Sequence, residues 1–180
     1  MTTIENIQAY TLQNIDEFFR GHVNEWIVQM TTYIERTTNR SFSTDDEVSI
    51  RKYDGNGAQV LLVDDFVELE EVTIDGALVA VTVYPANTMP KYKLIADGRF
   101  TKGRQNVAVT ARWGYGIVPN DLVFACTVLV AGLVQNHTKS DGAMASESIG
   151  NYSVSYATDA QRDDFNRAKE ILAMYRVHHL

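Results

Sequence analysis

The longest apolar run of this 180-residue chain, Leu122–Val134, places the strongest limit on the folds open to it. Pro119 and Asp121, just before the run, favour the first turn of a helix, because that turn needs no N–H from proline and attracts negative charge. The run of 13 residues is shorter than the roughly 20 that a helix needs to cross a bilayer. We therefore predict a buried helix from Leu122 to about Gln135.

This central helix is apolar on all sides and must be covered on all sides. Other helices of the same chain would cover it, and so would the same helix of a neighbouring subunit. The sequence leaves both arrangements open.

Two amphipathic segments are predicted to form helices on either side of the central one. The first begins at Asn14, which forms a capping pair with Glu17, and runs to about Thr38. The second follows Thr158, which forms a capping pair with Gln161. Their apolar faces consist of Ile15, Phe18, Phe19, Val23, Trp26, Ile27, Met30, Tyr33 and Ile34 in the first, and of Phe165, Ala168, Ile171, Leu172 and Tyr175 in the second.

Residues 46–113 change from a helical period to the alternation of β-strands, separated by glycine-containing turns. The expected hairpins join a strand with Val48 and Ile50 to Val60–Val63 through Asp54–Gly57, and Val67–Ile74 to Leu78–Tyr84 through Asp75–Gly76. Tyr92–Ile95 and Val107–Trp113 are further strands. The segment Asn136–Ala145 is expected to be a loop, and Ser148–Tyr156 alternates again, as in an extended arm or hairpin.

These elements predict an α+β protein. Its body is a helical bundle of a long N-terminal helix, an apolar central helix and a C-terminal helix, within residues 1–45 and 114–180, with the extended arm near 146–157. A small antiparallel β domain, a barrel or a sandwich, is inserted at 46–113.

The chain is acidic, with 16 Lys and Arg against 23 Asp and Glu and a formal net charge of -7. Tight binding to a phosphate backbone requires the opposite sign, so the charge argues against a DNA reader. It does not argue against a conduit, because a negative lumen repels phosphates and lets a duplex slide. The densest acidic stretch comprises Asp64, Asp65, Glu68, Glu70 and Glu71, without EF-hand spacing. We interpret it as a solvated strand edge that discourages unwanted pairing, or alternatively as a surface facing a DNA channel or a basic partner.

Residue patterns typical of catalysis, cofactors or metals are not found in the sequence. The histidines, His22, His137, His178 and His179, lack the spacing of a helical zinc site. Cys126, the single cysteine, lies in the apolar run, where burial suppresses thiol reactivity. Gly55 and Gly57 are turn residues without the third glycine of a dinucleotide fingerprint. We expect no enzyme, cofactor, metal or membrane anchor, and no signal peptide at the N-terminus.

Several segments together resemble the head-tail connector, or adaptor, family of long-tailed bacteriophages. They are Ile34–Phe42 (IERTTNRSF), Tyr53–Gly57 (YDGNG) with Leu61–Leu62, Val72–Gly76 (VTIDG), Lys102–Thr110 (KGRQNVAVT), Gly114–Leu122 (GYGIVPNDL) and Ser146–Tyr156 (SESIGNYSVSY). Their order and spacing cover roughly residues 34–176.

The resemblance implies a virion structural protein of the neck, made in the host cytoplasm, that assembles with copies of itself into a ring, commonly twelvefold. Such a ring binds under the portal protein, extends the DNA channel without sequence-specific contact, and offers its far face to the next neck or stopper protein. The resemblance also implies a portal contact near the C-terminus, at Tyr175, Arg176, Val177, His178, His179 and Leu180. Deletion of residues 176–180 is then expected to leave subunits folded but to block joining.

Two alternatives remain from the sequence. One is another neck component, a stopper or tail-completion protein, which would be mostly strand. The other is a small-ligand-binding module with a pocket floored by Tyr84 or Tyr92.

Overall fold

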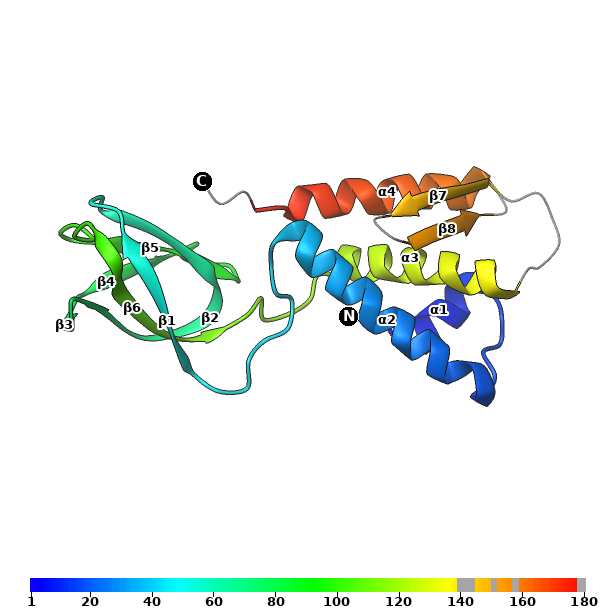
Figure 1. Ribbon diagram of the computed structural model, residues 1–180, viewed down its shortest axis with the longest axis horizontal. Helices are drawn as coiled ribbons and strands as arrows, with labels where there is room; N and C mark the ends of the chain where they lie inside the picture. Colours follow the sequence, from blue (N-terminus) through cyan, green and yellow to red (C-terminus); the bar gives the residue numbers. More distant parts are fainter. Residues whose placement is uncertain (139–144, 150–151, 157–158, 178–180) are drawn as a thin grey trace. The chain divides into compact units, whose positions relative to one another are not determined.

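A computed structural model describes residues 1–138, 145–149, 152–156 and 159–177, the backbone alone at 138, 145–149 and 152–156. The chain divides into two compact units. We name Met1–Asn39 with Val118–Leu180 the helical unit and Arg40–Ile117 the β unit; Figure 1 labels the helices and strands of each. Four helices and an antiparallel sheet confirm the α+β class.

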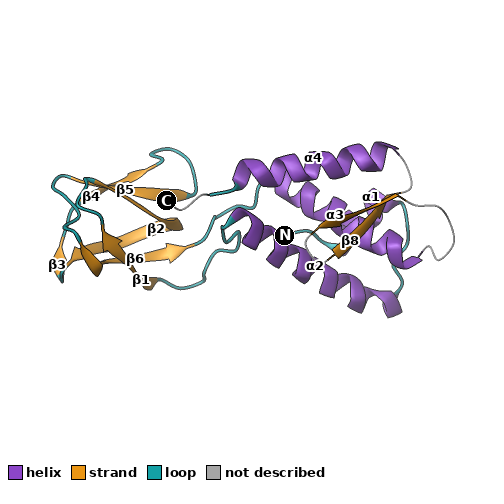
Figure 2. Cartoon of the chain, turned by 45° about the horizontal axis from the view of Figure 1, so that its top comes forward, coloured by secondary structure: helices purple, strands orange, loops and turns teal. Residues whose placement is uncertain are grey.

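The helical unit is built around α3 (Asn120–Thr138), which contacts α1 (Ile4–Thr11), α2 (Glu17–Thr38) and α4 (Asp159–Tyr175). The predicted hairpin near residue 150 is present as β7 (Ala145–Ile149) and β8 (Tyr152–Tyr156), and β8 also packs against α3 (Figure 2). The expected loop from Asn136 is wrong at its start, because α3 continues to Thr138; residues 139–144 lie outside the described part. No described helix combines the length and the apolarity that a membrane span requires.

Elements of the same chain cover α3, which answers the question that the sequence left open. The side chains of Leu122, Ala125, Cys126, Leu129 and Val130 have no solvent exposure. Thr127, the hydroxyl residue of the run, hydrogen-bonds Thr2 with 2.6 Å between the two Oγ1 atoms. A neighbouring subunit is therefore not needed to bury this helix.

The buried position of Cys126 predicts a slow thiol. Burial raises its pKa to about 11, so the reactive thiolate is scarce near neutral pH. Labelling by an aromatic disulfide reagent at pH 8 is expected to be at least tenfold slower in the native protein than in 6 M guanidinium, where the pKa returns towards its ordinary value near 9. Equal rates under the two conditions would contradict the buried position.

Two details of the N-terminal helices differ from the sequence prediction. The long helix begins at Glu17, and its N-cap is Asp16, whose carboxylate accepts from the Phe19 N–H at 2.9 Å. Asn14 instead accepts from the Gln8 side chain at 3.0 Å. Helix α1 was not predicted, because its eight residues bury only Ile4 and Ile7, too few for a clear period. The Thr158 cap lies outside the described residues.

The β unit contains a strongly bent sheet in the order β1-β6-β2-β5-β4, with β3 paired to the end of β2. The strands are β1 (Ser49–Gly55), β2 (Val60–Ile74), β3 (Ala77–Leu78), β4 (Val81–Tyr84), β5 (Lys91–Ala96) and β6 (Gly103–Trp113). β2 pairs with β5 up to Phe66 and with β6 from Phe66 onward, so this one strand connects the two halves of the sheet.

The first predicted hairpin is wrong, because β1 pairs with β6 and not with β2. The last residues of β1, which were expected to turn into a hairpin, bind the first part of β6 instead. Asn106 accepts from the Gly55 N–H at 2.9 Å, and Asp54 accepts from the Gln105 N–H at 2.7 Å.

The second predicted hairpin is right at its turn and wrong beyond it. Asp75 and Gly76 both have positive φ, and β3 pairs with the end of β2 for two residues. The chain then leaves, and β4 pairs with β5. The buried faces of both sheet halves share one core that includes Leu61, Val63, Phe66, Val72, Leu94, Phe100, Val107, Val109 and Trp113.

Candidate interaction surfaces

The acidic stretch of β2 divides into two parts with different surroundings. Asp64 and Asp65 lie inside the strand, not at its start, and both have cationic partners. Asp64 accepts from Arg51 at 2.8 Å, and both oxygens of Asp65 accept from one nitrogen of Arg40 at 2.9 Å. The Asp65 side chain is only 8% exposed, so this carboxylate is part of the packed fold, whereas the Asp64 side chain is 43% exposed.

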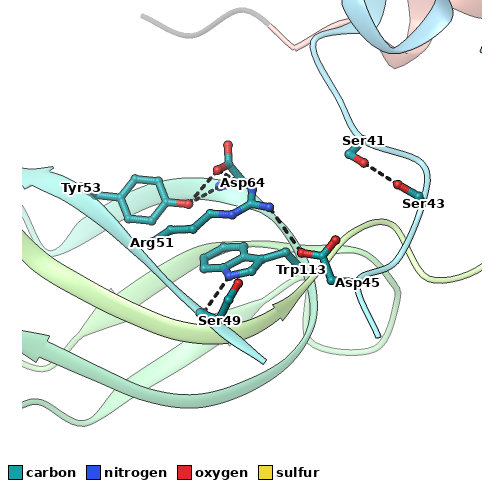
Figure 3. A network of polar contacts seen from close by, with 8 residues as sticks. All are labelled: Ser41, Ser43, Asp45, Ser49, Arg51, Tyr53, Asp64 and Trp113. Atoms are coloured by element: carbon teal, nitrogen blue, oxygen red, sulfur yellow. Dashed lines mark hydrogen bonds and ion pairs between the residues drawn. The ribbon is translucent and has the colours of Figure 1, made fainter. Parts of the chain in front are cut away.

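Arg51 is the centre of a polar network at one end of the β unit (Figure 3). Its guanidinium lies 4.5 Å from the centroid of the Trp113 ring, with Asp64 and the more distant Asp45, at 3.6 Å, as acidic partners. Tyr53 donates to Asp64 at 2.9 Å, and the burial of its hydroxyl, followed by the charge of Asp64, raises its pKa. The network therefore closes the core over Trp113.

The second part of the stretch, Glu68, Glu70 and Glu71, lies at the surface. Glu68 pairs with Arg112 across β6 at 3.2 Å, an ion pair exposed enough to contribute little to stability. Within the described β unit, residues 67–71 have sheet partners only in β6, and two irregularities interrupt that register. These three side chains are the exposed part of the acidic stretch.

The segment predicted to contact the portal begins inside the fold. Tyr175 is half-buried, and its hydroxyl donates to the carboxylate of Asp121 at 3.0 Å. The Val177 N–H donates to the Thr38 carbonyl at 2.9 Å, whereas Arg176 is exposed. His178, His179 and Leu180 lie outside the described residues. No sequence pattern predicted the Tyr175–Asp121 contact, which joins residues 54 positions apart.

Two histidines take part in an aromatic cluster. The ring of His137, at the end of α3, stacks on Phe19 of α2 at 5.1 Å and lies 5.7 Å from Trp26 and 6.2 Å from His22. Across the described residues, no three His, Cys, Asp or Glu side chains converge as a metal site would require. The cluster packs α2 against α3.

The tyrosines expected to floor a ligand pocket are at the surface. Tyr84, on β4, is 42% exposed and Tyr92, on β5, is 37% exposed. The guanidinium of Arg40 lies 6.0 Å from the centroid of the Tyr92 ring. Neither ring belongs to the buried core.

Sequence reasoning missed a set of apolar side chains that the fold leaves exposed. On α2, Phe18 is 91% exposed and Val28 is 65% exposed, although the helix stripe assigned Phe18 to the core. On β2, Leu62 is 57% exposed. Strand alternation was the available signal at Leu62, because its neighbours Leu61 and Val63 point into the core.

The model of the family described as "Head completion protein" matches residues 1–178. The chain belongs to the head completion protein family. It is accordingly a structural protein of the virion with a role in head completion, and not an enzyme. No curated protein matches the sequence.

Among solved structures, the fold of this head completion protein is similar to that of a chain in the "neck of empty GTA particle computed with C6 symmetry". The TM-score is 0.51 at 14% identity, over 89% of this chain and 80% of the other. At this identity the likeness concerns the fold.

Proposed function

We propose that this head completion protein is a subunit of the ring that joins the portal of the phage head to the neck and extends the DNA channel. The family match over residues 1–178 carries this proposal, because it covers both units. The fold shared with a neck chain supports a position in the virion neck. We propose that the subunit reaches it after synthesis in the host cytoplasm. The helical unit favours a connector over a stopper or tail-completion protein, which we expect to be mostly strand.

The proposed subunit consists of a helical bundle with the β unit as an inserted domain. We propose twelve copies in the assembled ring. The similar neck structure was computed with sixfold symmetry, and a twelvefold ring also has that symmetry. A ring turns many weak contacts into a tight joint. Its partners would be the portal protein above and the next neck protein below.

Genomic DNA would pass through the ring without sequence-specific contact. The net charge of -7 disfavours attachment to phosphates, and Glu68, Glu70 and Glu71 are exposed carboxylates that could line a channel. Asp65 does not belong to this proposed surface, because its side chain is only 8% exposed and binds Arg40, and Asp64 is left out because Arg51 and Tyr53 both bind its carboxylate.

The C-terminal segment remains our proposed portal contact, now reduced to Arg176–Leu180, since Tyr175 is held by Asp121. Among the described residues, a chain ending at Tyr175 loses the backbone bonds from Arg176 to Ala173 and from Val177 to Thr38 but keeps the whole of α4, so it should stay folded. We expect this truncation to lower joining to heads at least tenfold, because the loss repeats in every subunit of the ring. Tyr175→Phe is the matched control, expected to lose about 1 kcal/mol of stability and to join normally. Normal joining by the truncated chain would refute the assignment.

Electron microscopy of the portal vertex tests the proposed function directly. Purified protein is mixed with DNA-filled, tailless heads of the parent phage, and the vertex is imaged before and after. A ring of added density beneath the portal is expected. An unchanged vertex with folded protein left free would refute the connector role and favour a later neck component.

A further inference from the structure

The outer face of the second half of the sheet, formed by β2, β5 and β4, is apolar with one cation at its centre. The register places Val60, Ile95 and Thr82 in one cross-strand row and Leu62, Lys93 and Tyr84 in the next. Residues directly opposite in a sheet share a face, and their neighbours Leu61 and Leu94 are buried on the other face. Val60, Leu62 and Tyr84 are 38%, 57% and 42% exposed.

A second exposed surface on the same chain has the complementary pattern. Phe18, Gly21, Glu25, Val28 and Thr32 follow one another along α2 at intervals of three and four residues, so they form one stripe, and all are exposed. Glu25 lies between the two apolar side chains, Phe18 and Val28. Within the described residues, no ion pair is found for Glu25 or for Lys93.

Gly21 points to close approach of another surface. Glycine inside a helix weakens it relative to alanine. A Cβ at Gly21 would meet nothing within 4 Å, so the packing of this chain gives no reason for glycine. A partner lying flat on α2 would give one, because glycine lets it approach the helix backbone.

We propose that the α2 stripe of one copy docks on the β2-β5-β4 face of the next copy, with Glu25 against Lys93. The dimensions agree: Phe18 to Val28 spans about 15 Å of helix, and three strands span about 10 Å between the outer two. Because the two surfaces differ, the contact is head-to-tail and continues from copy to copy until a ring closes. This inference rests on the proposed ring and names the surfaces that would build it.

Cross-linking of the concentrated full-length protein tests the contact without the portal. The variant Glu25→Cys/Lys93→Cys places one thiol on the exposed α2 stripe and one at the half-buried position 93 of β5, and the buried Cys126 does not compete with them. Mild oxidation is expected to give a ladder of dimers and higher multimers that reducing agent reverses. The control Glu25→Cys/Lys52→Cys places the second thiol on β1, on the other half of the sheet, and should remain monomeric. A cross-link confined within one chain, or no faster ladder than the control, would overturn the inference.

Charge reversal measures the same contact in assembly on heads. Lys93→Glu and Glu25→Lys are each expected to lower the number of joined heads about tenfold, and the double reversal to restore it to within about threefold. Lys52→Glu serves as the matched control and should join like the unmodified chain. Gly21→Gln should raise Tm through better helix propensity and still lower joining, which separates docking from folding.

The two proposals fail in different ways. If the unmodified chain joins heads and both single reversals join equally well, the docking inference is wrong and the connector role stands. If the unmodified chain leaves the portal vertex unchanged, the connector role is wrong, and the cross-linked ladder alone decides whether the copies meet through these two surfaces.

Discussion

Replacing Trp113 with alanine is expected to lower the free energy of unfolding of the β unit by about 3–5 kcal/mol, the usual cost of removing a fully buried large aromatic side chain. The ring has no solvent exposure and packs edge-on against Phe66, where β2 changes partners. Its Nε1–H donates to the Ser49 carbonyl at 2.9 Å, and Arg51 covers its face. Alanine would remove all of these contacts at once.

Urea denaturation followed by two probes checks this prediction. The sequence has two tryptophans, and in Trp113→Ala the remaining one, Trp26, reports on the helical unit. Hydrogen exchange should accelerate across residues 40–117, while the fluorescence transition of Trp26 should move much less. Trp113→Phe, which keeps a ring and loses the hydrogen bond, is the control, with an expected cost of about 1 kcal/mol for that bond. An unchanged midpoint for the alanine variant would show that the ring does not support the core.

The sequence predicted elements well where a regular period continued for many residues. The apolar run from Leu122 and the amphipathic stripes of α2 and α4 marked three helices, because helical burial repeats along the chain itself. The turn at Asp75–Gly76 was visible for the same local reason: its two residues adopt positive φ.

Strand pairing was not predictable in the same way, because it is decided by contacts between residues far apart in the sequence. Gly55 looked like part of a hairpin turn, yet its N–H is bound by Asn106, 51 residues later. A single strand, β2, was predicted as two, because its alternation of buried residues shifts between Val63 and Phe66, where the strand changes partner. The exposed side of α2 was missed, because the sequence shows nine apolar residues in one stripe but not which of them other elements of the chain cover. Phe18 belongs to that stripe and is exposed.

Contacts between distant residues also decide which carboxylates of the acidic stretch are exposed, and the sequence alone does not show these contacts. Five carboxylates in a row of eight residues look alike in sequence. The fold separates them, because Arg40 and Arg51 approach from other strands and segments and bind two of the five. Sequence spacing could not assign either arginine to its carboxylate, because Arg40 and Asp65 are 25 residues apart and Arg51 and Asp64 are 13 residues apart.

The ion pair between Arg40 and Asp65 gives the second large effect. The side chains of Asp65 and Arg40 are 8% and 17% exposed, so water can do little to solvate one charge when the other is removed. Arg40→Met leaves a buried carboxylate without its guanidinium, which typically costs about 3–5 kcal/mol. The guanidinium also lies 5.7 Å from the centroid of the Tyr115 ring, so the loss should reach the segment that leaves the β unit.

A double-mutant cycle separates the pair from its surroundings. Asp65→Leu alone leaves the Arg40 guanidinium without the Asp65 carboxylate. Arg40→Met/Asp65→Leu removes both charges, so the double variant should recover most of the stability lost in either single variant. Urea denaturation at pH 7 measures all three against the unmodified chain. Arg112→Met is the matched control: its partner Glu68 is 62% exposed, and the expected loss is below about 1 kcal/mol. Strictly additive losses in the cycle would mean that Arg40 and Asp65 stabilise the β unit independently of each other.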